Sequence, residues 1–152
     1  MFMLRIGGLM IWLSVISYIF YPAAVFWSLI TFPSWMVWIG AAASAVSVFL
    51  LVWMFTSLGK NITDSVSIRE EHSLITSGPY RYIRHPLYVF GALLFLSISL
   101  IMGSWFIPLV GIPTYAILIY RTGIEEEMLT ERFGNKYTQY MQRTGRFFPR
   151  LG

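Results

Sequence analysis

The polar residues that could carry chemistry fall into two blocks of an otherwise apolar chain. The first block, residues 58–85, ends in RYIRH directly before Pro86. The second begins at Arg121 and contains three consecutive glutamates, Glu125, Glu126 and Glu127. Arginine and histidine can donate hydrogen bonds to anions, whereas carboxylates accept them from cations and hydroxyls. We therefore expect any functional site where these two blocks meet.

Pro86 marks the start of an apolar helix at the end of the first block. Proline suits a first helical position because its missing N–H would have no partner there, and its ring keeps His85 extended. The free N–H groups and the helix dipole make this a candidate anion site, which Arg81 and Arg84 would reinforce. The spacing is equally compatible with arginines that only bind lipid headgroups.

The glutamates of the second block lie in a segment with helical periodicity. Apolar residues recur at helical spacing in it, at Ile124, Met128, Leu129 and Phe133. We expect an amphipathic helix on the cytoplasmic surface that ends at Gly134. Successive helical residues point about 100° apart, so at least one glutamate should face the bundle. The alternative is a solvated acidic face that pairs with Arg121 or Arg132.

Membrane helices must position these blocks. The chain has 152 residues, of which 57% are hydrophobic and 12% charged. Residues 6–59 and 86–120 contain no charged residue and no histidine. A bilayer core about 30 Å thick takes about 20 helical residues to cross, so each stretch accommodates two crossings. The sequence therefore predicts an all-α, polytopic membrane helix bundle with four transmembrane helices and a cytoplasmic amphipathic C-terminal helix.

The boundaries follow from glycines and prolines. A single domain, residues 1–152, should contain helices near 5–21, 35–57, 86–102 and 104–121, a cytoplasmic loop at 58–85 and a tail at 122–152. Gly103 and Ser104 predict a tight helical hairpin, and Pro108 and Pro113 should kink the last helix. Residues 22–32 either extend the first helix past a proline kink or lie in the membrane interface. The small residues of GAAASAVSVF suit close helix packing.

The basic residues predict the orientation. With four crossings, all eleven Lys and Arg residues lie on one side, which the positive-inside rule makes cytoplasmic. We expect a prokaryotic inner (plasma) membrane protein with both termini in the cytoplasm. The chain has no cysteine and two histidines, so no metal site is expected, and His72 is interpreted as a loop residue.

Taken together, the two blocks resemble a known family. SGPYRYIRHPLYVFG, followed after a helical hairpin by EEEMLTERFGNKYTQYMQRTGRFFP, is similar to the isoprenylcysteine carboxyl methyltransferase and phospholipid methyltransferase family of integral membrane enzymes. The upstream LGKN and REEHSLITSG also resemble that family. The resemblance extends from about Leu58 to Pro149, and it rests on several ordered motifs.

The resemblance implies S-adenosylmethionine as cofactor, bound by both blocks at the cytoplasmic mouth of the bundle. The implied cofactor-binding residues are Gly78, Tyr80, Arg84, His85, Pro86, Tyr88, Glu125 and Glu126, and the implied catalytic residues are Glu126 and Arg143. Arg84 and His85 suit the carboxylate of the cofactor, and Glu125 or Glu126 suits its ammonium or ribose. Because Glu127 adds a third acid, the sequence leaves open which glutamates face the pocket.

The implied function is methyl transfer to a lipophilic small molecule or lipid-linked acceptor, through a carboxylate or an amine. Membrane lipids are expected partners and nucleic acid is not; the acceptor and the oligomeric state stay open. The first alternative is an NADPH-dependent membrane lipid reductase of related architecture. The second is a small transporter or non-enzymatic membrane protein, although the spans lack the ionisable group that transporters usually need.

Overall fold

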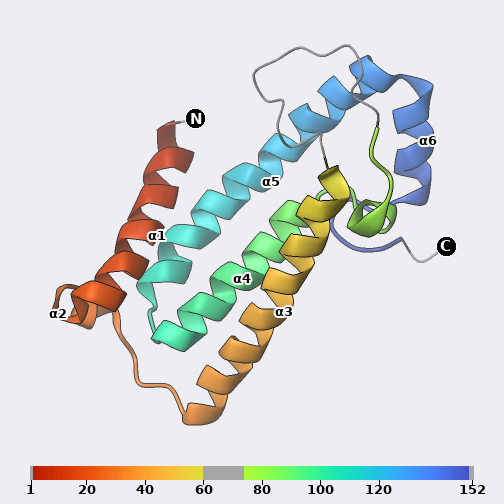
Figure 1. Ribbon diagram of the computed structural model, residues 1–152. Coiled ribbons are helices and arrows are strands. Elements are labelled where there is room, and N and C mark those ends of the chain that lie inside the picture. Colours follow the sequence, from red (N-terminus) through yellow and green to blue (C-terminus); the bar gives the residue numbers. More distant parts are fainter. Residues whose placement is uncertain (1, 60–73, 151–152) are drawn as a thin grey trace.

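The described part of the chain, residues 2–59 and 74–150 of a computed structural model, is helical and contains no strand. In chain order its elements are α1 (Phe2–Phe20), α2 (Pro22–Val25), η1 (Phe26–Ser28), α3 (Ser34–Leu58), η3 (Gly78–Arg81), α4 (Pro86–Met102), α5 (Phe106–Phe133) and α6 (Asn135–Arg143) (Figure 1). The predicted all-α class is confirmed. Lys60, Arg69 and His72, which the sequence analysis placed in a cytoplasmic loop, lie outside the described residues.

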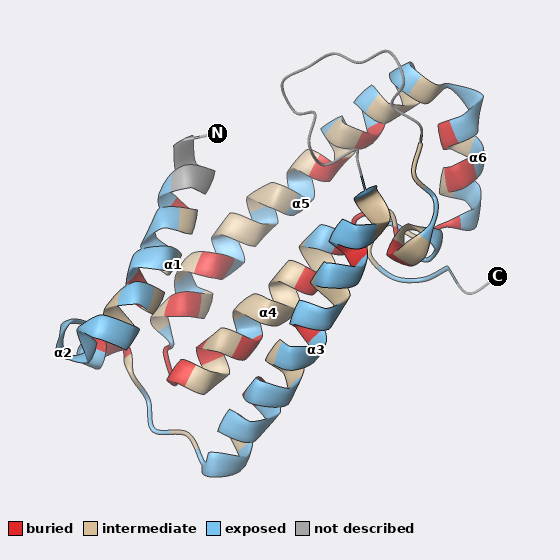
Figure 2. Cartoon of the chain, in the orientation of Figure 1, coloured by how far each residue is buried: buried red, intermediate tan, exposed pale blue. Residues whose placement is uncertain are grey.

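The outer surface of the bundle is strongly apolar. Two helices, α3 and α5, are long and apolar enough to cross a membrane, and Ile6–Phe20 and Pro86–Met102 form shorter apolar helices. Exposed residues line most of α3, as Figure 2 shows, and Trp38 is 75% and Phe49 69% exposed. Such a surface suits hydrocarbon better than water. The number of crossings stays a prediction.

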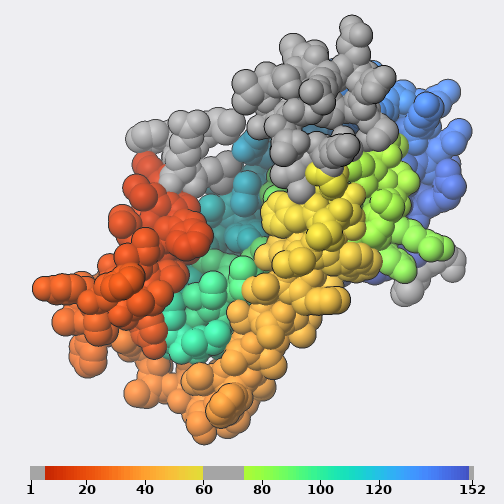
Figure 3. All heavy atoms as spheres, in the orientation of Figure 1, coloured from red at the N-terminus to blue at the C-terminus, as the bar shows by residue number. Residues whose placement is uncertain are grey.

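Helices α3 and α4 pack closely because small residues line their contact. The Ser47 side chain is fully buried, and its Oγ donates a 2.6 Å hydrogen bond to the carbonyl of Phe90. A Cβ atom on Gly40 would lie 3.0 Å from the Leu100 side chain. The expected packing role of GAAASAVSVF is therefore confirmed. On the face shown in Figure 3, side chains of α4 and α5 lie between those of α1 and α3.

The α4–α5 connection is the predicted tight hairpin. Gly103 ends α4 in the left-handed conformation at φ 64°, which glycine adopts without strain. The segment before α3 folds back onto this turn, because the Ile30 amide donates to the Gly103 carbonyl at 2.6 Å and the Trp105 amide to Ser28 at 3.1 Å. Residues 22–32 thus form α2, η1 and a packed connection, and they do not continue α1 as one helix.

Helix α5 joins two segments that the sequence analysis treated separately. It continues from the apolar run, which ends at Tyr120, through the charged residues that start at Arg121. It ends as predicted at Gly134, whose φ is 55°. Pro108 lies in the first turn of α5, where its missing N–H removes no helical hydrogen bond. The charged part of α5 therefore continues the same helix beyond the uncharged part.

Candidate functional site

The two polar blocks meet at one end of the bundle, where the last turn of α3, the start of α4 and α6 lie close together (Figure 1). The segment after α6 runs parallel to the segment before α4, with a bridge between Ile83 and Gly145. The Arg84 amide donates to the Gly145 carbonyl at 2.9 Å, and the His85 amide to the Arg146 carbonyl at 3.1 Å. The expected meeting of the two blocks is thus present.

The Glu126 carboxylate lies at the centre of this junction. Arg84 Nε donates to Oε1 at 2.8 Å, and His85 Nε2 lies 3.1 Å from the same oxygen. Arg146 Nε donates to Oε2 at 3.1 Å, and its terminal nitrogen binds the same atom. Burial alone would raise the pKa of Glu126, but these hydrogen bonds hold that pKa at about 2. The ionised carboxylate therefore has partners on both oxygens.

Glu125 is held differently and stays more open. The Tyr88 hydroxyl donates to its Oε1 at 2.8 Å, and the glutamate side chain is 28% exposed. His85 Nδ1 lies 3.8 Å from Glu125 Oε2, and the imidazole stacks on the Tyr88 ring with centroids 5.7 Å apart. Glu127 is exposed. Of the three glutamates, Glu125 thus combines a fixed position with access from outside.

His85 has a defined protonation pattern. Burial lowers its pKa, although the hydrogen bond to Glu126 opposes this shift. A neutral imidazole has one N–H, and the ionised Glu126 can only accept, so Nε2 carries the proton. Nδ1 is left as an acceptor on the side of Glu125.

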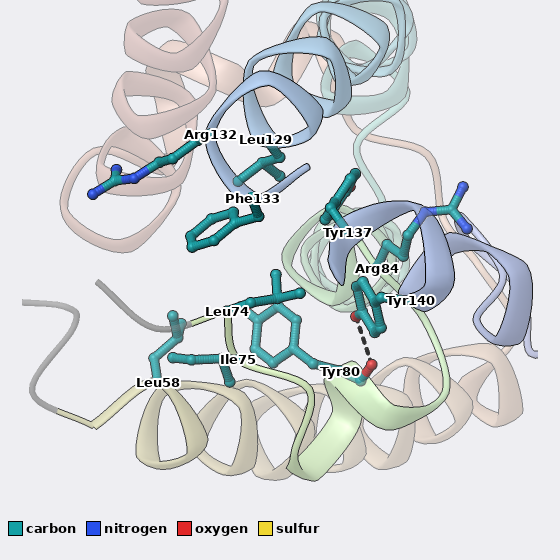
Figure 4. A pocket seen from close by; sticks show the side chains of 10 residues that line it. All are labelled: Leu58, Leu74, Ile75, Tyr80, Arg84, Leu129, Arg132, Phe133, Tyr137 and Tyr140. Carbon is teal, nitrogen blue, oxygen red and sulfur yellow. Dashed lines mark hydrogen bonds between the residues drawn. The ribbon is translucent and has the colours of Figure 1, made fainter. Parts of the chain in front are cut away.

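A cavity of about 240 Å³ lies beside this cluster, between the end of α3, η3, α5 and α6 (Figure 4). Its walls are mostly aromatic and aliphatic and include Tyr80, Phe133, Tyr137 and Tyr140, with Arg84 and Arg132 at its edge. The Tyr140 hydroxyl donates to the Tyr80 carbonyl at 2.6 Å. Glu125 precedes the wall residues Leu129 and Phe133 by one and two helical turns, which places it on the same face of α5.

Tyr137 lines this cavity and is almost completely buried. The residue is 1% exposed, and its oxygen forms no hydrogen bond of ordinary geometry among the described residues. Burial raises the pKa of Tyr137 to about 12, although the nearby Arg84 guanidinium opposes this rise, so the hydroxyl keeps its proton. A buried hydroxyl without a partner costs about 1–3 kcal/mol. A ligand that accepts a hydrogen bond here would remove that cost.

The remaining predicted residues have other surroundings. Pro86 is buried at the first position of α4. Gly78 has φ 59°, and a Cβ there would lie 2.0 Å from Ser57 Oγ. The absence of a side chain at Gly78 therefore lets η3 pack closely against α3. Arg143 is not brought to the Glu126 cluster; its Nε donates to the Gln139 carbonyl at 3.4 Å, and it lines a separate cavity.

Two residues of this junction were missed by the sequence analysis. Arg146 completes the cluster around Glu126, and the Phe147 ring lies 5.9 Å from that of His85. In the sequence, Arg146 is one of several basic residues in the tail. Nothing distinguishes it before the tail is known to pair with the residues that precede α4.

Comparison with known proteins gives a consistent result. Residues 35–136 match the model of the phospholipid methyltransferase family. Protein-S-isoprenylcysteine O-methyltransferase of Dictyostelium discoideum is 32% identical over 136 residues, which are 82% of this chain and 51% of the relative. The cobalt-zinc-cadmium resistance protein CzcN of Cupriavidus metallidurans is 36% identical over 89 residues, 57% of this chain and 40% of the relative.

A solved structure shows the same fold. The eukaryotic intramembrane Ras methyltransferase ICMT, an isoprenylcysteine carboxyl methyltransferase, superposes with a TM-score of 0.68 at 26% identity. The match covers 95% of this chain and 51% of that protein. The chain thus spans about half the length, or less, of these relatives.

Proposed function

The chain belongs to the phospholipid methyltransferase family of membrane methyltransferases and is similar to isoprenylcysteine O-methyltransferases, and we propose from this premise that it transfers a methyl group from S-adenosylmethionine to a lipophilic acceptor. The observation that carries the proposal is the junction of Arg84, His85, Tyr88 and the two glutamates beside an aromatic cavity. The junction supplies, within one end of the bundle, the donors, the acceptor and the apolar wall that this cofactor requires.

The residues present fit S-adenosylmethionine. Tyr80, Phe133 and Tyr140 would hold the adenine, and the unpaired Tyr137 hydroxyl would donate to one of its ring nitrogens. Glu125, whose side chain is 28% exposed, would bind the ammonium or the ribose hydroxyls. The bound cofactor would supply an electrophilic methyl group on its sulfonium.

Glu126 would act as a positioning residue in this arrangement. Both of its oxygens already have partners, so it holds Arg84, His85 and Arg146 in place. The role of cofactor ligand that the sequence analysis divided between the glutamates would then fall to Glu125. Arg143, expected near the chemistry, would have no contact with the reacting groups.

The protein's contribution to the reaction would be alignment and exclusion of water. Transfer to a carboxylate or an amine needs an in-line approach, so fixed donor and acceptor positions lower the barrier. Tyr88 and Glu126 fix the His85 ring from two sides. Its unprotonated Nδ1 would then be available to take a proton from an amine acceptor or to orient the acceptor.

A lipophilic acceptor fits a groove on the side of His85 where Phe147 lies. An almost wholly apolar groove of about 280 Å³ lies between α3, α4 and the tail, lined among others by Leu50, Trp53, Val89 and Phe147. Phe147 also contacts His85. The hydrocarbon part of an acceptor would lie in this groove, with its polar end directed toward His85.

The test is transfer of labelled methyl groups. Purified chain, S-adenosylmethionine with a labelled methyl group and a total membrane lipid extract are expected to yield a labelled, organic-soluble product. Saturable cofactor binding, weakened at least tenfold (about 1.4 kcal/mol) in His85→Ala, would support the site. NADPH binding without S-adenosylmethionine binding would overturn the proposal in favour of the reductase.

A further inference from the structure

A second cavity, of about 430 Å³, is lined by three cationic side chains that the proposed reaction does not use. Its lining residues are Thr76, Arg81, Lys136, Tyr140, Arg143 and Thr144. Among the described residues that line it, none is a carboxylate. Tyr140 also borders the aromatic cavity, so the two cavities are neighbours.

The fold itself brings these cations together. Arg81 is the last residue of η3, while Lys136 and Arg143 lie seven residues apart, two turns along the same face of α6. The 2.6 Å hydrogen bond from the Tyr140 hydroxyl to the Tyr80 carbonyl docks α6 on η3, directly next to Arg81. The cations therefore share one cavity because their elements are packed together.

Two carboxylates of this end of the molecule, Glu125 and Glu126, are engaged elsewhere. In residues 2–59 and 74–150, the ion pairs connect Glu125 and Glu126 with Arg84, His85 and Arg146, and none includes Arg81, Lys136 or Arg143. Three like charges around one cavity repel one another, and an anion in the cavity would replace that repulsion by attraction.

We propose that this cavity binds a phosphate group, carried by an anionic phospholipid headgroup or by free phosphate. Guanidinium groups match phosphate oxygens with paired N–H donors, and the lysine adds a point charge. Arg81 lies five residues before Pro86, at which the apolar helix α4 begins. The cavity thus borders the level at which lipid headgroups lie, while its exposed cations are also accessible to a soluble anion.

The experiment is a calorimetric titration of the purified full-length chain in a non-ionic detergent, without cofactor. The probes are inorganic phosphate, short-chain phosphatidylglycerol and, for comparison, short-chain phosphatidylcholine. Saturable binding of phosphate, phosphatidylglycerol or both, weakening as salt is raised, is expected. Binding of phosphatidylglycerol alone identifies the lipid as the source, binding of phosphate alone identifies the free anion, and competition shows one site for both. If neither binds, or if phosphatidylcholine binds as tightly as phosphatidylglycerol, the proposal is overturned.

A matched pair of variants locates the site. Arg81→Gln with Lys136→Gln should weaken binding at least tenfold, whereas Arg121→Gln with Arg132→Gln, which removes the same charge away from this cavity, should change it less than twofold. Equal losses in both pairs would mean a general charge effect and overturn the assignment. Should the first pair fail to fold, the single Lys136→Gln variant and the probe comparison on the unaltered chain still decide the question.

Discussion

Arg84 and Glu126 are 42 residues apart in the sequence, and 2.8 Å separates Arg84 Nε from Glu126 Oε1. The same guanidinium donates to the Met141 carbonyl at 3.2 Å and also binds the carbonyl of Thr144. One side chain therefore connects the start of α4, the charged part of α5 and the end of α6. Arg84, α5 and α6 all contribute to the lining of the aromatic cavity, so this connection holds part of its wall together.

Replacing Arg84 by lysine should loosen this junction. A lysine ammonium is a compact point charge and cannot reproduce the planar set of guanidinium donors that reaches α5 and α6 together. We expect Arg84→Lys to lower the stability by about 1–3 kcal/mol, since a buried acceptor loses its partner. Thermal unfolding in detergent measures this loss. Arg132→Lys, at an exposed arginine that lies over the Phe133 ring, is the control, and an equally large loss there would contradict the expectation.

The two adjacent glutamates should behave in opposite ways. Glu126→Gln leaves Arg84 and Arg146 without their counter-charge, so it should lower the Tm clearly and weaken S-adenosylmethionine binding only in proportion to the lost folded fraction. Glu125→Gln should leave the Tm within a few degrees of the parent and weaken binding about tenfold or more, because its carboxylate is the accessible one. Reversed behaviour of the pair would contradict the division of roles.

Acid should remove the contribution of Glu126 to stability. Its folded-state pKa of about 2 lies below the ordinary value of 4.5, so the unfolded chain binds this proton first. The stabilisation is therefore complete above pH 4.5 and is lost as the pH falls toward 2, a change of about 3 kcal/mol. Thermal unfolding at pH 6 and pH 3 measures it. The parent should lose more stability than Glu126→Gln over this interval, and parallel losses would refute the assignment.

Much of the fold could be predicted because its signals are local. Uncharged stretches, prolines and Gly103 determine where helices begin and end, and the end of α5 at Gly134 follows from the same kind of signal. The fold of residues 22–32 was left open because it depends on hydrogen bonds to the distant α4–α5 turn.

The site was predicted only in part, because some of its contacts depend on residues that are distant in the sequence. The RYIRHP and EEE motifs indicated which blocks meet, but two facts needed three dimensions. The position of Arg146 depends on the pairing of Gly145 with Ile83 across the junction. The separation of Arg143 from Glu126 depends on which face α6 turns toward α5, which the spacing of basic residues does not reveal.

Two glycines of α5 form a matched pair for testing how α5 packs against α4. A Cβ on Gly111 would lie 1.9 Å from the Phe95 ring, whereas a Cβ on Gly123 would meet no atom within 4 Å. Gly111→Ala should therefore destabilise the chain by about 1–3 kcal/mol through overpacking. Gly123→Ala should stabilise it by up to about 1 kcal/mol through better helix propensity. Unfolding midpoints of the two variants check this, and equal shifts would mean that α4 and α5 do not pack as described.

The buried tyrosines of the aromatic cavity provide the sharpest test of ligand binding. The Tyr137 hydroxyl forms no hydrogen bond of ordinary geometry among the described residues, so Tyr137→Phe should leave the Tm of the ligand-free chain unchanged or raise it. The same variant should bind S-adenosylmethionine several-fold more weakly, because the hydrogen bond to the ligand is lost. Tyr140→Phe is the matched control, since the Tyr140 hydroxyl donates to the Tyr80 carbonyl. Its loss should lower the free energy of unfolding by about 1 kcal/mol and therefore lower the Tm. A Tyr137→Phe variant with lowered stability and parental affinity would show that the hydroxyl serves the fold, and the adenine would then have to be placed elsewhere.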